Sequence, residues 1–162
     1  MKASSLLCLV SLLLAPLAGA EQTINYPAKK PFFSISFPDS WTVEGDDESV
    51  SASSDDELAN MELIALDADE LDGAIEIGKE SLKEELEGIK FSKVEKGELN
   101  GMNVSFLNGQ VTLEGVKMAV NCCVFAPKDA DTFFMLFNII PLEALEKHGE
   151  DIGKILNSVK GK

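Results

Sequence analysis

The strongest constraint on the fold lies between residues 91 and 125, where strand patterns are joined by two tight-turn signals. The stretch from Phe91 to Glu98 alternates polar and apolar residues, and Asn100-Gly101 follows it. Asn-Gly favours a two-residue turn between antiparallel strands. Met102 to Leu113 then predicts a long strand, and Glu114-Gly115 predicts the next turn. Three neighbouring antiparallel strands are therefore expected in this half of the chain.

The two strands that follow are apolar enough to need cover on both faces. Side chains alternate between the faces of a strand. One face of the strand after Gly115 carries Val116, Met118, Val120, Cys122 and Val124, and the other carries Ala119, Cys123 and Phe125. Residues 133–140 are almost entirely apolar. A strand with two apolar faces is expected to be covered on both. We therefore predict helices on the two sides of the sheet, or an extra segment packed over the second side.

Two amphipathic helices are predicted. Residues 71–89 place apolar side chains at three- and four-residue steps, and Gly88 is a natural stop. Asp69 or Asp72 is expected to cap the start of this helix. The second helix begins near Pro141 and reaches Val159, with a break expected at Gly149. Short strands are predicted at 32–37, 41–44, 50–53 and 61–66, and a bulge or bend is expected at Gly109.

The first twenty residues have the pattern of a removable secretion signal. Lys2 precedes an apolar run from Leu6 to Leu14, which is too short to span a bilayer. Cleavage is expected after Ala20. The alternative, a lipoprotein anchored through Cys8, fits poorly because that cysteine lies inside the apolar run. The predicted organisation is a signal peptide at 1–20, an extended arm at 21–31 and one α+β domain at 32–162. Its location would be periplasmic or extracellular.

The charge of the mature chain limits its partners. All 28 acidic residues remain after cleavage while Lys2 is lost, which gives a net charge of −15, and arginine is absent. Nucleic acids and anionic membrane surfaces would repel such a protein. A basic partner or a divalent cation would be attracted. The alternative interpretation is that the charge only keeps an exported protein in solution.

No pattern of residues predicts catalysis or a cofactor. Cys122 and Cys123 are neighbours, and their Cα atoms are too close for an ordinary disulfide, so we predict two buried free thiols. A strained vicinal disulfide acting as a switch is the minor alternative. His148, the only histidine, is expected on the surface. One histidine and two adjacent cysteines cannot form a zinc site. A weak divalent-cation site at Asp67, Asp69 and Asp72 remains an alternative to helix capping, although the spacing departs from the EF-hand pattern.

Three short motifs resemble PsbP-like proteins. Phe33-Ser-Ile-Ser-Phe-Pro-Asp-Ser-Trp41 looks like the opening F-x-I-x-F-P-x-x-W of that family. Leu99-Asn100-Gly101 resembles its turn before the long central strands, and Ile155-Leu156-Asn157-Ser158 resembles the end of its last helix. The resemblance covers most of residues 26–160 and implies an antiparallel sheet between helices, in an α/β/α sandwich. The superfamily includes DcrB-like exported bacterial proteins, extrinsic photosystem II proteins and a Ran-binding factor, whose roles are mostly docking.

We therefore predict a non-catalytic, exported accessory protein that binds an envelope or membrane-associated protein partner. Docking would use acidic loops, the sheet edge or the N-terminal arm, and would weaken with salt. One alternative is a small hydrolase using carboxylates, and another is a weak divalent-cation binder. Trp41 with its neighbouring phenylalanines could form an aromatic contact patch, although core packing is the favoured interpretation. The predicted partner surface comprises Trp41, Asp46, Asp47, Glu48, Asp55, Asp56 and Glu57.

Overall fold

The computed structural model describes residues 21–46, 49–128 and 130–162. The predicted signal peptide, with Cys8 and the cleavage site, lies outside this range. The elements in chain order are β1 (Glu21–Tyr26), β2 (Phe33–Pro38), β3 (Thr42–Gly45), β4 (Ser49–Ser53), β5 (Asn60–Leu66), α1 (Leu71–Glu85), β6 (Lys90–Phe91), β7 (Glu95–Leu99), β8 (Met102–Leu113), β9 (Val116–Phe125), β10 (Phe133–Pro141), the 3₁₀ turn η1 (Leu142–Ala144), α2 (Leu145–Ser158) and β11 (Lys160–Gly161).

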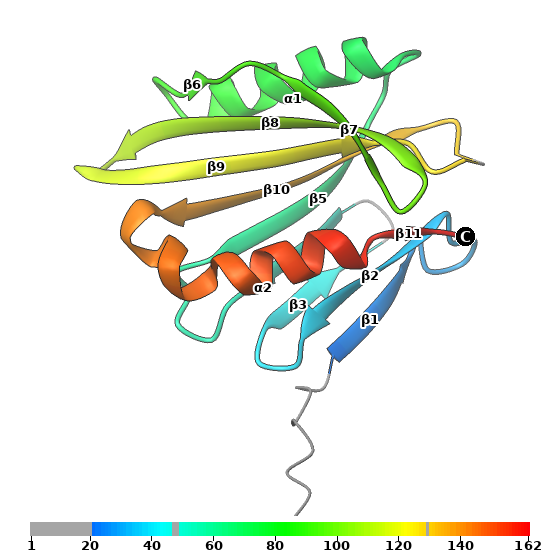
Figure 1. Ribbon diagram of the computed structural model, residues 1–162, viewed down its shortest axis with the longest axis horizontal. Helices are drawn as coiled ribbons and strands as arrows, with labels where there is room; N and C mark the ends of the chain where they lie inside the picture. The colour runs from blue at the N-terminus through cyan, green and yellow to red at the C-terminus, as the bar shows by residue number, and fades with distance from the viewer. Residues whose placement is uncertain (1–20, 47–48, 129) are drawn as a thin grey trace, which may run out of the picture.

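Most strands belong to one antiparallel sheet in the order β3-β4-β5-β10-β9-β8-β6, with β7 also paired to β8 (Figure 1). Both predicted tight turns are present. Asn100 and Gly101 have φ of 49° and 82°, and Glu114 and Gly115 have φ of 50° and 85°. Two consecutive residues with positive φ match the twist of the flanking strands. The turns therefore fix the register of β7, β8 and β9, as the sequence predicted.

The sheet is covered on both faces, as the apolar strand β10 requires. Helix α1 covers one face, where Leu82 packs with Cys122, Met135 and Phe137. The other face is covered by α2 and by a second sheet of order β1-β2-β11 (Figure 1). The predicted α+β class and antiparallel sheet are confirmed. The layer opposite α1 contains strands as well as a helix, because Phe33, Ile35 and Phe37 of β2 fill that side of the core.

The N-terminal segment predicted as an arm begins with a strand. β1 pairs with β2 along its whole length, from Glu21 opposite Pro38 to Tyr26 opposite Phe33. The tyrosine side chain is buried and its ring contacts Phe33 and Phe134. Residues 21–26 are therefore part of the folded structure, because they cover an edge of β2 that would otherwise expose unpaired backbone groups.

Three local predictions were wrong, and the bulge expected at Gly109 is absent. Glu70 is the N-cap of α1 and no side chain caps it, so neither Asp69 nor Asp72 has that role. The strand predicted at 91–98 is divided into β6 and β7. Helix α2 continues through Gly149 without a break. At Gly109 the pairing with β9 is continuous and there is no bulge. A Cβ atom at this glycine would lie 3.1 Å from Phe91 and 3.2 Å from Ile89, so close packing over the strand explains the glycine.

Within the described part of the chain, no helix has both the length and the apolar character needed to cross a bilayer.

Candidate functional site

Cys122 and Cys123 are free and buried, as predicted. They lie on opposite faces of β9, with Cys122 in the core under α1 and Cys123 in the core on the α2 side. Burial raises the pKa of each thiol to about 12. The thiolate is the reactive form of cysteine, so neither thiol is suited to act as a nucleophile near neutral pH.

The prediction that His148 lies on the surface is wrong. Its side chain is 5% exposed, and Nε2 lies 3.0 Å from Oδ2 of Asp56. The same carboxylate accepts hydrogen bonds from Lys147 Nζ at 2.5 Å and from Ser54 Oγ at 2.7 Å. The Lys147 bond is the main reason why the pKa of Asp56 lies well below its ordinary value. The only histidine therefore helps to hold the loop before β5 against α2.

The predicted partner surface is not one continuous surface. Trp41 is only 4% exposed and belongs to the core, so the patch interpretation is wrong for this residue and core packing is confirmed. Asp46 precedes β4, whereas Asp55 and Glu57 follow it. A five-residue strand separates these two loops by about 17 Å. Asp47 and Glu48 lie outside the described residues.

The aspartates proposed as a cation site do not converge. Asp72 instead forms an ion pair with Lys96 on β7, with 3.2 Å between Oδ1 and Nζ. Asp67 and Asp69 are exposed in the segment between β5 and α1. The described ranges contain no group of three or more His, Cys, Asp or Glu side chains that could hold a metal ion.

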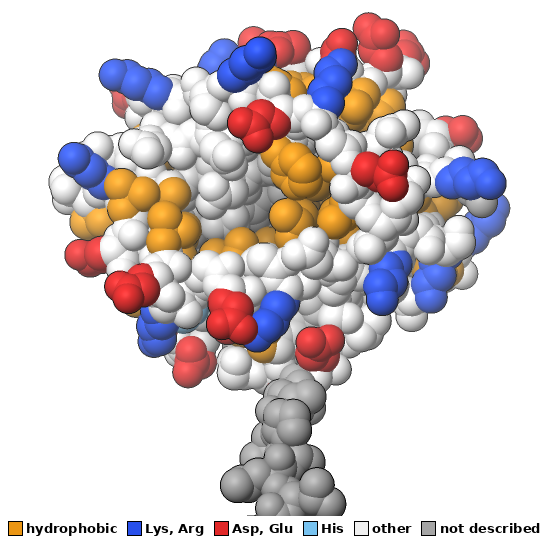
Figure 2. Space-filling model, in the orientation of Figure 1, with side chains coloured by type: hydrophobic (Ala, Val, Ile, Leu, Met, Phe, Trp, Pro, Cys, Tyr) orange, Lys and Arg blue, Asp and Glu red, His pale blue; other side chains and the backbone are white. Residues whose placement is uncertain are grey.

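A strongly acidic stretch of the chain lies on and beside α1. Residues 67–87 contain nine acidic residues and two lysines, which gives a net charge of −7. These 21 residues therefore carry almost half of the net charge of −15 in residues 21–162. The helix buries its stripe of Ala74, Ile75, Gly78 and Leu82 against the sheet, which leaves the charged side chains on the outer face. Figure 2 shows acidic side chains along the top of the molecule, where α1 lies.

One large apolar side chain lies within this acidic face. Ile77 is 40% exposed, whereas most large apolar residues of the described chain are buried. It lies one helical turn from Glu80 and two turns from Glu84, on the same side of α1. The outer face of α1 thus combines negative charge with one partly exposed apolar side chain.

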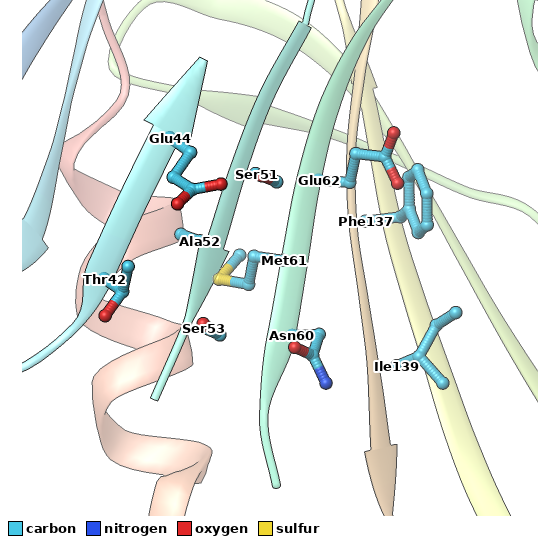
Figure 3. A pocket seen from close by; sticks show the side chains of 10 residues that line it. All are labelled: Thr42, Glu44, Ser51, Ala52, Ser53, Asn60, Met61, Glu62, Phe137 and Ile139. Carbon is cyan, nitrogen blue, oxygen red and sulfur yellow. The ribbon is translucent and has the colours of Figure 1, made fainter. Parts of the chain in front are cut away.

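A shallow groove of about 350 Å³ lies on the face of the large sheet that α1 covers, because Phe137, which lines the groove, belongs to the core under that helix. Figure 3 shows the side chains that line the groove. Glu44, Ser51, Glu62 and Phe137 form a row across β3, β4, β5 and β10. Burial raises the pKa of Glu62, and the charge of Glu85 at the end of α1 raises it further. Glu62 therefore holds a proton more readily than an ordinary surface glutamate.

The two glutamates of the groove do not form a convergent pair. Their strands are separated by β4, which places their Cα atoms about 10 Å apart. Figure 3 shows the carboxylate of Glu44 extending toward Ser51, while that of Glu62 extends beside Phe137 and away from Glu44. The two acids therefore do not face a common point.

The acidic face of α1 has a signal in the sequence, whereas the Asp56 cluster has none. The amphipathic pattern at 71–89 predicts a polar, solvent-exposed face on this helix. The contact between Asp56 and His148 joins residues 92 positions apart, and no local pattern indicates it.

Comparison with known proteins identifies the fold. No protein-family model matches the chain, and no curated protein matches it. Solved structures do match. Cyanobacterial PsbP (CyanoP) from Synechocystis sp. PCC 6803 has 12% identity and a TM-score of 0.62, covering 93% of this chain and 99% of that one. The Ran-binding protein Mog1p from Saccharomyces cerevisiae has 8% identity and a TM-score of 0.61, covering 89% and 96%.

LpqN, which is involved in cell envelope biogenesis of Mycobacterium tuberculosis, has 15% identity and a TM-score of 0.59, covering 86% of this chain and 90% of that one. The chain therefore has the fold shared by PsbP-like proteins and Mog1, which confirms the resemblance found in the sequence motifs. At these identities the likeness establishes the fold and does not establish a shared activity.

Proposed function

We propose that this protein is a non-catalytic, exported accessory protein that binds a basic protein partner along the outer face of α1. The observation that carries the proposal is the composition of this face, where a net charge of −7 within residues 67–87 surrounds the exposed side chain of Ile77. Export follows from the predicted signal peptide and places the partner in the cell envelope or outside the cell.

The mechanism of binding combines long-range attraction with a short-range apolar contact. A surface of one sign accelerates the encounter with a partner of the opposite sign, and this effect weakens as salt is added. Ile77 would provide the contact that excludes water, since charged side chains at the rim of an interface contribute little by themselves. The helix is held rigidly by its buried stripe, so binding requires no reordering of the backbone.

One comparison supports a binding role, and a second supports a place in the cell envelope. Mog1p is a Ran-binding protein, and LpqN is involved in cell envelope biogenesis. Within this chain, the groups that usually carry catalysis are engaged in structure, because both thiols are buried and His148 contacts Asp56.

Binding can be tested with two variants of equal charge. Envelope proteins from the native organism would be cross-linked to the purified mature protein, and the captured partner would then be purified for titration. The first variant changes four exposed glutamates on or beside α1 to glutamine, at Glu70, Glu80, Glu84 and Glu87. The control changes four exposed glutamates elsewhere, at Glu21, Glu98, Glu143 and Glu146.

We expect the α1 variant to bind at least tenfold more weakly than the control, and Ile77→Ser to weaken binding without changing its salt dependence. Equal affinity of the two glutamine variants would contradict the assignment to α1. If substitution of Asp46, Asp55 and Glu57 abolished binding instead, the binding surface would be assigned to the acidic loops.

A second candidate function, hydrolysis by carboxylates, is favoured by one observation. The groove of Figure 3 contains two glutamates, and the pKa of Glu62 is raised. The test is hydrolysis of 4-nitrophenyl glycosides by the purified protein and by Glu62→Gln and Glu44→Gln. Activity that disappears in both variants would support this candidate, whereas activity equal in all three proteins would come from a contaminant and would exclude it.

A further inference from the structure

A cleft of about 200 Å³ lies between α2 and the large sheet, on the face opposite α1. Its walls are mainly apolar, with Ile152 and Leu156 from the helix and Phe106 and Leu136 from the sheet. Figure 2 shows hydrophobic side chains gathered around a hollow near the centre of this view, where Figure 1 places α2 beneath β8, β9 and β10. The cleft is therefore open to solvent on one side.

Three asparagines cross the sheet side of this cleft in a single row. Asn138 on β10 is opposite Asn121 on β9, which is opposite Asn108 on β8. All three line the cleft. Their burial increases along the row, from the exposed Asn108 through the half-buried Asn121 to Asn138, which is 2% exposed. The row of amide side chains therefore runs from the exposed rim of the cleft to its buried interior.

The innermost amide has an unused donor. The Nδ2 atom of Asn138 is buried and has no hydrogen-bond partner among the residues that the structure describes. Buried polar groups are nearly always hydrogen-bonded, and an exception requires an explanation. An apolar residue of similar size would avoid the cost of an unpaired donor. A donor kept in this position, at the buried end of a cleft, is explained by a ligand that supplies the acceptor.

We propose that this cleft binds a small, uncharged molecule with a compact apolar body and a carbonyl group that accepts a hydrogen bond from Nδ2 of Asn138. The volume of the cleft limits the ligand to about the size of one substituted ring, because a cavity of about 150 Å³ holds benzene. Charge excludes an anion, since Glu95 lies at the rim, no lysine lines the cleft and the mature chain is strongly acidic. The site lies on the other face of the sheet from α1, so it does not depend on the proposed function.

Three small probes test the proposal by NMR titration of the ¹⁵N-labelled mature protein. Acetophenone carries a ring and a carbonyl, ethylbenzene has nearly the same shape without the acceptor, and benzoate carries a negative charge. We expect acetophenone to shift the amide signals of β8, β9, β10 and α2 around the cleft and to bind about 3- to 10-fold more tightly than ethylbenzene. Benzoate should give no saturable shift.

Two variants locate the effect. Asn138→Leu removes the donor, so acetophenone and ethylbenzene should bind with equal affinity. Ile152→Phe fills the cleft from α2 and should abolish binding of both. Asn103→Leu changes an exposed asparagine that does not line the cleft and should leave both affinities unchanged.

Equal binding of the two neutral probes to the wild type, binding of benzoate, or shifts confined to another region would each overturn the proposal. If Asn138→Leu does not fold, the wild-type comparison of the neutral probes and the Ile152→Phe variant decide the question.

Discussion

Replacing Asn100 should destabilise the protein through two separate effects. This residue is the first of the β7–β8 turn and has a φ of 49°. Its side-chain Nδ2 donates to the carbonyl oxygens of Asn157 at 2.8 Å and Val159 at 2.7 Å. These carbonyls belong to the end of α2, where helical partners are lacking. Asn100 therefore supports the turn conformation and also fastens the helix end to the hairpin.

The expected size of each effect follows from its chemistry. A net hydrogen bond contributes about 1 kcal/mol, and partial exposure reduces the two bonds together to about 1–2 kcal/mol. A positive φ in alanine costs about 1 kcal/mol more. Asn100→Ala should thus lower the free energy of unfolding by about 2–3 kcal/mol, and Asn100→Gly by about 1–2 kcal/mol, since glycine accepts a positive φ.

Urea unfolding followed by circular dichroism measures both variants. With a slope of about 2 kcal/mol per molar urea, the midpoint of Asn100→Ala should fall by about 1 M. Asn103→Ala, an exposed change on the next strand, serves as the control. Asn100→Ala within about 0.3 kcal/mol of the wild type would refute the reasoning, because that figure is below the smallest expected hydrogen-bond contribution. Equal loss in the alanine and glycine variants would refute the backbone part alone.

Three further predictions concern charge, thiols and packing. The pKa of Asp56 is lowered in the folded protein, chiefly by Lys147, so the contribution of this carboxylate to stability is present above about pH 4 and is lost as the pH falls. The melting temperatures of the wild type and Asp56→Asn should therefore converge at acid pH. A constant difference between the two melting temperatures across the pH range would contradict this prediction. The thiols of Cys122 and Cys123 have pKa values of about 12 and should not react with Ellman's reagent at about pH 8 until urea unfolds the chain. Rapid reaction of the native protein would disprove their burial. Gly109→Val should lower the free energy of unfolding by about 1–3 kcal/mol, because the new Cβ would lie 3.1 Å from a ring carbon of Phe91. An unchanged urea midpoint would show that the side chains of Phe91 and Ile89 move aside without cost.

Much of the large sheet could be predicted because its signals are local. Asn100-Gly101 and Glu114-Gly115 specify turns that depend only on the backbone preferences of neighbouring residues. The alternation on β9 assigned Cys122 and Cys123 to opposite faces correctly, because the period of a strand is fixed by its geometry. The division of the strand at 91–98 was missed, since the apolar pattern does not record which residues pair with β8.

The candidate sites were less predictable. The acidic side of α1 follows from helical periodicity, and Ile77 is visible in the sequence as an apolar residue between glutamates. The row formed by Asn108, Asn121 and Asn138 depends on the register of three strands, and its three members are separated by 13 and 17 positions. Only the paired sheet brings them together and places them opposite α2.

The sequence alone determined the antiparallel sheet, the two helices and the negative charge, because turns, side-chain periods and ionisable groups are properties of short segments. Tertiary structure decided the roles of single polar and aromatic residues. Trp41 is part of the core, His148 contacts Asp56, and Asn138 is a buried donor without a partner in the described part of the chain. Burial and hydrogen bonding of a side chain depend on which distant residues pack around it, and that arrangement is set by the whole fold.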